Sequence, residues 1–255
     1  MNASAKPAIK WAKPPKSNAA AAAVDAGRAL RRRASRKSQA AWRPSPDRPD
    51  PVEILRQSDK GRLADLLPIR YGRMLVSPFT FYRGAAAIMA SDLAPLPVSG
   101  VRTQICGDAH LLNFGGFGTP ENQFVFDVND FDETTLGAWE WDVKRLVTSI
   151  IIAGRHLKLQ QSESRAAALA CIRAYRERVR GYAAMNVLDV WYDRIDSARL
   201  TEIFRSAEER RQYQVSIHKA KVETREHLFP KFAQDAGGAP TIVDDAPLLY
   251  HPHHV

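Results

Sequence analysis

The chain has 255 residues, of which 45% are hydrophobic and 25% are charged, as is typical of a soluble globular protein. Its formal net charge is +9, and residues 1–50 account for all of this excess, with 12 Lys and Arg against three acidic residues. These numbers exclude a chain that is disordered throughout. The sequence contains no apolar run of 18 residues, so no membrane span is predicted.

Residues 1–49 are predicted to form a disordered basic tail, because Ala, Pro, Lys and Arg dominate and apolar anchors are few. The tail is either a solvated arm or a region of weak contact with nucleic acid or other anionic surfaces. Its Arg-rich start also resembles an organelle transit peptide, but no signal-peptide pattern is present, so we expect a cytoplasmic protein. The two cysteines, Cys106 and Cys171, match no metal or redox spacing.

Residues 50–255 are predicted to form one ordered domain. Asp50-Pro51 predicts a capped helix start, and the apolar residues of 63–74 predict a helix interrupted at Pro68. An Ala-rich helix is expected over residues 85–93. Alternating side chains predict strands over 101–106 and 123–128, and we expect these two to form a hairpin-like unit that carries the acidic residues.

Four further helices are predicted from the apolar periodicity that follows the second strand. They cover residues 139–159, 162–185, 188–204 and 208–228. The predicted fold class is therefore α+β, mostly helical, with a small β-hairpin-like unit.

Asp108 follows Gly107 at the end of the first predicted strand. A carboxylate in this position can accept the proton of a substrate hydroxyl during phosphoryl transfer, or it can simply cap the following turn. Asn113 lies five residues later, and its amide oxygen is a typical ligand for a hard cation. Together, Asp108 and Asn113 indicate a general base and a metal ligand, respectively.

Three carboxylates follow the second predicted strand: Asp127, Asp130 and Asp132. Because like charges repel, such a cluster needs either a cation or basic partners, for which Lys144, Arg145 and Arg83 are candidates. We favour Asp130 as the metal ligand, with Asp127 and Asp132 as further candidates.

His110 and Arg83 are candidates for cofactor binding. His110 could also ligate a metal or act in acid/base chemistry, although a lone turn histidine often makes a structural hydrogen bond. Arg83 could offer its guanidinium to phosphate or form a salt bridge to an acid. A metal-dependent hydrolase built on His110 ranks lowest, because no second histidine lies at ligand spacing.

Five segments form long motifs: residues 50–52, 68–71, 77–86, 106–115 and 127–133. They resemble a large bacterial family known as domain of unknown function 2252. The resemblance runs from about Asp50 to the last residue and implies no established activity.

Gly107-Asp108 with Asn113, then Asp130 and residues 139–143, resembles the catalytic core of aminoglycoside phosphotransferases and choline kinases. The resemblance implies a kinase-like C-terminal lobe in which Asp108 is the base, Asn113 and Asp130 bind Mg²⁺, and Asp142 steadies the catalytic loop. Two departures are that Cys106 stands where those enzymes have His, and that no Gly-rich nucleotide loop precedes Asp108.

Relatives in the resembled family extend past the last residue and contain a Gly-rich segment suited to nucleotide phosphates. We therefore expect the chain to be truncated at its C-terminus, with ATP as a cofactor of full-length relatives. The leading hypothesis is a Mg-dependent phosphotransferase that acts on an unknown small molecule or protein. Its site is incomplete in this chain, so the chain is either active without the missing part or inactive. The alternative is a non-catalytic module that binds metal or a partner at the acidic site and anionic surfaces through its tail.

Overall fold

The computed structural model describes residues 18–119, 121, 123–204, 206–222, 233–235, 237 and 240–244. Internal contacts divide the chain into two units, and the second comprises residues 115–127 together with residues from 194 onward. The described residues are mostly helical and carry small sheets, so the predicted α+β class is confirmed. In the part of the chain that the structure describes, no helix is long and apolar enough to cross a membrane.

The predicted tail differs from the structure after residue 17. Helix α1 covers Asn18–Arg33, because five consecutive alanines favour a helix and no proline interrupts them. After a 3₁₀ turn at Ser38–Ala40, Arg48 Nε lies 2.6 Å from Asp92 Oδ1, and Gln39 donates to the carbonyl of Pro97. Gln39 and Arg48, both within the predicted tail, therefore contact the segment that contains α5 and the residues after it. The first 17 residues of the predicted tail lie outside the described residues.

Four short helices follow: α2 (Pro51–Ser58), α3 (Leu67–Met74), α4 (Pro78–Arg83) and α5 (Ala86–Leu93). Proline lies in the first turn of α2, α3 and α4, where a missing N–H costs no hydrogen bond. Pro68 therefore lies in the first turn of a helix, preceded by a 3₁₀ turn at Ala64–Leu66, and does not interrupt one. A small core joins these helices through Leu55, Met74, Ala85 and Ile88.

The predicted strand pairing is wrong. β1 (Arg102–Ile105) pairs antiparallel with β4 (Thr135–Ala138), with Arg102 opposite Ala138. β3 (Phe124–Val128) belongs to a second sheet, between β2 (Phe114–Gly118) and β5 (Ile195–Asp196). Residues 114–118 are rich in glycine, which is typical of a turn, yet they form strand β2. The second predicted strand, β3, therefore pairs with β2 and not with β1.

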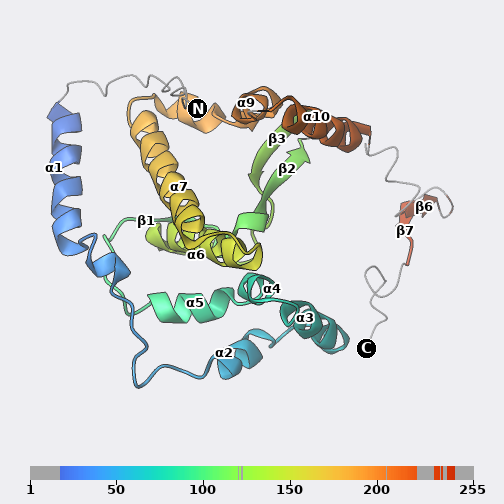
Figure 1. Cartoon of the computed structure of the whole chain (residues 1–255), viewed down its shortest axis with the longest axis horizontal. Helices are drawn as coiled ribbons and strands as arrows, with labels where there is room; N and C mark the ends of the chain where they lie inside the picture. Colours follow the sequence, from blue (N-terminus) through green and yellow to red (C-terminus); the bar gives the residue numbers. More distant parts are fainter. Residues whose placement is uncertain are drawn as a thin grey trace. The chain divides into compact units, whose positions relative to one another are not determined.

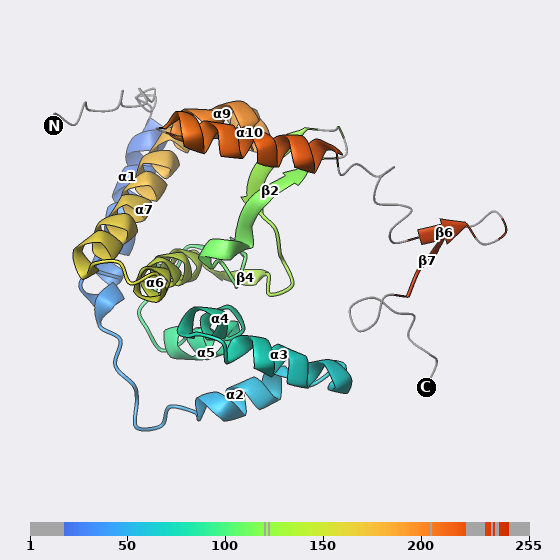
Figure 2. The same ribbon diagram turned by 45° about the vertical axis from the view of Figure 1, so that its right-hand side comes forward.

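Helix α6 (Glu140–His156) lies between α7 (Gln161–Tyr182) on one side and α4 and α5 on the other (Figures 1 and 2). Gly154 allows the close approach of α6 to α7, since a Cβ there would lie 2.2 Å from Ser164 Oγ. The Trp139 ring stacks on Tyr175 with centroids 5.7 Å apart. One face of α6 packs against the loop that follows β1.

The predicted helix over residues 188–204 is divided in the structure. The predicted helix 188–204 is divided into α8 (Val187–Tyr192), strand β5 and α9 (Ser197–Ile203), and α9 is capped by Asp196. Helix α10 covers Ala207–Val222, and the rest of the predicted helix 208–228 lies outside the described residues. Strands β6 (Ala233–Asp235) and β7 (Pro240–Ile242) pair antiparallel.

Candidate functional site

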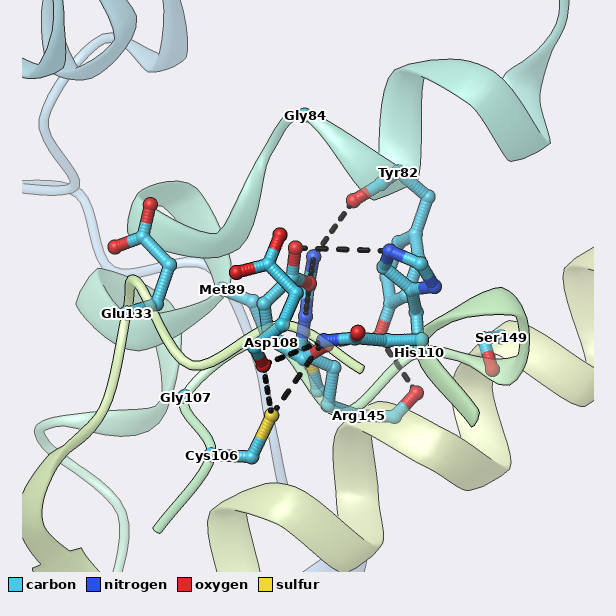
Figure 3. Close-up of polar contacts among 12 residues, drawn as sticks. Tyr82, Gly84, Met89, Cys106, Gly107, Asp108, His110, Glu133, Arg145 and Ser149 are labelled. Carbon is cyan, nitrogen blue, oxygen red and sulfur yellow. Dashed lines mark hydrogen bonds and ion pairs between the residues drawn. The ribbon is translucent and has the colours of Figure 1, made fainter. Parts of the chain in front are cut away.

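The loop after β1 turns sharply at Gly107, which has a φ of +80°. A Cβ at Gly107 would lie 2.1 Å from the carbonyl oxygen of Glu133, so this turn fits only glycine. The loop continues through Asp108 and His110 to a 3₁₀ turn at Leu111–Asn113. The close approach brings the loop into contact with residues that follow the acidic segment, as Figure 3 shows for Gly107 and Glu133.

One face of α6 holds this loop at successive points. Asp142 accepts hydrogen bonds from the backbone N–H groups of Cys106 (2.7 Å) and Gly107 (3.0 Å). Arg145 contacts the Asp108 carboxylate, and Ser149 accepts from the N–H of Leu111 at 2.9 Å. Asp142, Arg145 and Ser149 are spaced i, i+3 and i+7, which places them on the same side of a helix. The loop is therefore fixed by a rigid element.

Arg145 is 2% exposed, and Figure 3 shows it with Asp108 and Tyr82. Nε donates to Asp108 Oδ1 at 2.5 Å, and Nη2 contacts the same oxygen and donates to the carbonyl of Tyr82 at 2.8 Å. The guanidinium also lies 4.4 Å from the centre of the Tyr82 ring. A buried cation is thus paired with the carboxylate proposed as a base.

The pKa of Asp108 is raised to about 6 by burial, which disfavours the charged form. The Arg145 guanidinium opposes this rise, while the nearby carboxylates of Glu133 and Asp130 add to it. A carboxylate whose pKa lies near neutrality is suited to accept and release a proton.

His110 is 6% exposed, and burial lowers its pKa to about 4, with the charges of Arg145 and Arg83 acting in the same direction. Its imidazole is therefore neutral at pH 7. The 3.6 Å between His110 Nε2 and Asp108 Oδ2 is consequently a polar contact and not an ion pair. Among the described residues, His110 Nδ1 has no hydrogen-bond partner although it is buried.

Asn113 joins the two loops of the site. Its side-chain nitrogen donates to the carbonyl oxygens of Asp108 (3.0 Å) and Asp130 (3.2 Å) and contacts Cys106 Sγ at 3.6 Å. The Cys106 thiol in turn donates to the Asp130 carbonyl at 3.5 Å. Because the amide nitrogen of Asn113 donates its hydrogen bonds to the two loops, Oδ1 is the side-chain atom left to contact a ligand.

The acidic residues are arranged unequally. Asp130 and Asp132 are exposed in the turn after β3, where Asp130 Oδ1 accepts from the N–H of Asp132 at 3.0 Å. Asp127 is exposed on β3, in the second unit of the chain. Arg83 is exposed at the end of α4 and acts on the pKa of His110. The site therefore assembles Asp108, His110, Asn113 and Asp130.

The part of the chain that the structure describes shows no metal centre made of protein ligands alone. Among the described residues, no group of three or more His, Cys, Asp or Glu side chains could hold a metal ion. Asn113 is buried, and its amide nitrogen contacts the backbone of both Asp108 and Asp130, so the side-chain oxygens of these three residues are the candidates for holding a cation. A set of one or two carboxylates fits Mg²⁺, which usually keeps waters or phosphate oxygens as its other ligands.

Sequence reasoning named Arg145 only as one of several partners for the acids, and it missed Tyr82 and Ser149. The spacing of Asp142, Arg145 and Ser149 carries a signal, because polar residues at i, i+3 and i+7 lie on one side of a helix, and they need partners if that side is buried. The contacts of Tyr82 carry no such signal, because its carbonyl and its ring meet Arg145 only through the packing of α4 on α6.

A bacterial family matches most of the chain. The chain belongs to the family described as "Uncharacterized protein conserved in bacteria (DUF2252)", which matches residues 62–255. The match contains the whole loop and helix arrangement described above. A search of curated proteins and a search of solved structures each found no match.

Proposed function

We propose that the Asp108 site performs Mg-dependent phosphoryl transfer of the kinase-like type, with Asp108 as general base. The observation that carries the proposal is the bracing of one loop by α6, which presents a carboxylate of raised pKa beside Asn113 and Asp130. Preorganised groups of this kind lower the barrier of phosphoryl transfer mainly by position and charge.

In the proposed reaction, an acceptor hydroxyl approaches Asp108 and loses its proton to the carboxylate. The hydroxyl oxygen forms a bond to the terminal phosphorus of ATP, and the bond between that phosphorus and the bridging oxygen breaks. ADP leaves with the electron pair of the broken bond. Asp108 later returns its proton to solvent, which a pKa of about 6 permits near neutral pH.

Asn113 Oδ1 and the Asp130 carboxylate are the groups that would hold Mg²⁺. When bound, the ion neutralises phosphate charge and draws the nucleotide to the site. Asp130 is exposed and so accessible to a nucleotide, while Asn113 is fixed by its two backbone contacts. Arg83, exposed at the end of α4, supplies a further positive charge for phosphate. Because ATP is the donor, we also propose a cytoplasmic location.

Calorimetry tests this proposal directly. Mg²⁺ and ATP are titrated into the protein separately and together, with Asp130→Asn as the variant and Asp189→Asn as an exposed acid remote in sequence from the site. Coupled binding that Asp130→Asn weakens and Asp189→Asn retains supports the proposal. Binding of neither ligand, or equal binding by both variants, contradicts it.

The ion pair between Arg145 and Asp108 favours a second candidate function. The ion pair between Asp108 and the buried Arg145 can instead have a purely structural role. The chain would then be a non-catalytic module, with its basic N-terminal region available to anionic surfaces. In that case Asp108→Asn alters folding stability, but phosphoryl transfer is absent in every variant. Measurement of ADP formation separates the two candidates.

A further inference from the structure

The two carboxylate oxygens of Asp108 have different neighbours (Figure 3). Oδ1 accepts from Arg145 Nε at 2.5 Å and also contacts Nη2, whereas Oδ2 lies 3.6 Å from His110 Nε2. A distance of 3.6 Å is too long for a hydrogen bond, for which about 2.9 Å is usual. One oxygen is therefore engaged by the protein, and the other faces a second polar group without bonding it.

The side chain of Arg145 has little freedom to move with the Asp108 carboxylate. Nη2 also donates to the Tyr82 carbonyl at 2.8 Å, Nη1 contacts Met89 Sδ at 3.8 Å, and the Tyr82 hydroxyl donates to the Arg145 carbonyl at 3.0 Å. The side chain is held on several sides and is almost fully buried. Its position consequently determines which oxygen of Asp108 is turned towards His110.

The polar groups of His110 and Asp108 suit one hydroxyl group. An oxygen within about 2.8 Å of both Oδ2 and Nε2 would donate its proton to the carboxylate and accept the imidazole N–H, which closes the gap between them. The His110 side chain is buried, and among the described residues its Nδ1 has no partner, so contacts within the protein do not account for both ring nitrogens.

We propose that Arg145 is a positioning residue that presents Asp108 Oδ2, together with Nε2 of His110, as a subsite for one hydroxyl group. This rests on the proposed function, in which the hydroxyl belongs to the phosphoryl acceptor and its proton passes to Oδ2. His110 then serves the acceptor and not the nucleotide, which differs from the cofactor-binding role expected from sequence. The acceptor is an alcohol, and water can take its place in ATP hydrolysis.

The first test needs no catalysis. The variants are Arg145→Gln and Arg145→Lys, with Arg155→Gln as an exposed arginine on the same helix. The readout is the ¹⁵N spectrum of the histidine side chains, with His110→Gln to assign the signal of His110. Arg145→Gln should shift this signal, Arg145→Lys should shift it less, and Arg155→Gln should leave it in place. A folded Arg145 variant with an unmoved His110 signal overturns the proposal.

If Arg145→Gln does not fold, Arg145→Lys decides, because it retains the buried charge and still loses the contact of Nε with Oδ1. The second test measures ADP formation from MgATP with water as acceptor. We expect kcat to fall about 100-fold in Arg145→Gln with KM for MgATP within about twofold, as displacement of a reacting group by about 1 Å costs that much. A raised KM with unchanged kcat overturns the positioning role. Absence of ADP formation by the unaltered chain contradicts the proposed function, while the spectrum still decides the role of Arg145.

Discussion

Nε of Arg145 lies 2.5 Å from Oδ1 of Asp108, which ties a buried cation on α6 to the carboxylate at the start of the site loop. This pair does not abolish the effect of burial, since the pKa of Asp108 is still raised to about 6. The Asp108 side chain is 18% exposed, so solvent reaches it. It therefore combines a fixed position with a pKa suited to proton exchange.

Asp108→Asn should lower the rate of phosphoryl transfer by at least about 100-fold, because removal of a general base usually costs 10²–10⁴-fold. The amide retains the shape of the side chain, so MgATP binding should stay within about twofold of that of the unaltered chain. ADP formation and calorimetry measure the two effects. Unchanged ADP formation in Asp108→Asn would remove this residue from the mechanism.

Asp142→Asn should destabilise the chain, because the carboxylate accepts two backbone N–H groups and an amide presents one oxygen and one donor. The expected loss in the free energy of unfolding is about 2 kcal/mol, in the range of hydrogen bonds to charged groups. Urea unfolding measures it, with Glu177→Gln on the exposed side of α7 as control. Equal stability of the two variants would mean that Asp142 does not hold the loop.

Gly107→Ala and Gly61→Ala separate backbone strain from steric conflict. Both glycines have positive φ, +80° and +84°, but a Cβ at Gly107 meets the Glu133 carbonyl at 2.1 Å, whereas nothing lies within 4 Å of one at Gly61. Gly61→Ala should cost about 1–2 kcal/mol from conformation alone. Gly107→Ala should cost at least about 1 kcal/mol more, because the loops must move apart. Similar losses in urea unfolding would show that the two loops do not meet tightly at Gly107.

The pH dependence of stability follows from two opposed pKa shifts. The folded-state pKa of Asp108 is raised above the usual value of 3.8, so its contribution to stability falls as pH rises from about 4 to about 6. The folded-state pKa of His110 is lowered to about 4, below the usual value of 6.5, so its contribution to stability is present above pH 6.5 and is lost as pH falls. A difference of two pKa units corresponds to roughly 3 kcal/mol.

Removal of one group should therefore reveal the other. Between pH 4 and 6.5, the free energy of unfolding should rise with pH in Asp108→Asn and fall with pH in His110→Gln, relative to the unaltered chain. Urea unfolding across this range provides the measurement. Parallel pH profiles for the two variants would contradict the burial of Asp108 and His110.

The site loop was predictable because its signals are local. A glycine before Asp108 at a strand end, with Asn113 one turn later, describes the loop as the structure has it, and Asp130 lies in the turn after β3 as expected. The pairing of β1 with β4 was not predictable in this way. Residues 135–138 show no alternation, and the partner of a strand depends on contacts distant in sequence.

Helix α1 and Arg145 illustrate two further limits. Clustered basic residues at the end of α1 predicted disorder, yet its alanines favour a helix and the residues after it find partners such as Asp92. The sequence predicts which face of the helix carries Arg145, but it does not predict which element packs against that face. Arg145 pairs with Asp108 and not with the exposed acidic residues, because the face of α6 that carries Arg145 is buried against α4.

The most direct test of the central claim is to locate Mn²⁺ as a paramagnetic substitute for Mg²⁺. With a non-hydrolysable ATP analogue present, Mn²⁺ should broaden the side-chain amide signal of Asn113, and Asp130→Asn should weaken this effect. Unbroadened Asn113 signals at Mn²⁺ and nucleotide concentrations that saturate the protein, or broadening that Asp130→Asn leaves intact, would contradict a phosphoryl-transfer site at Asp108.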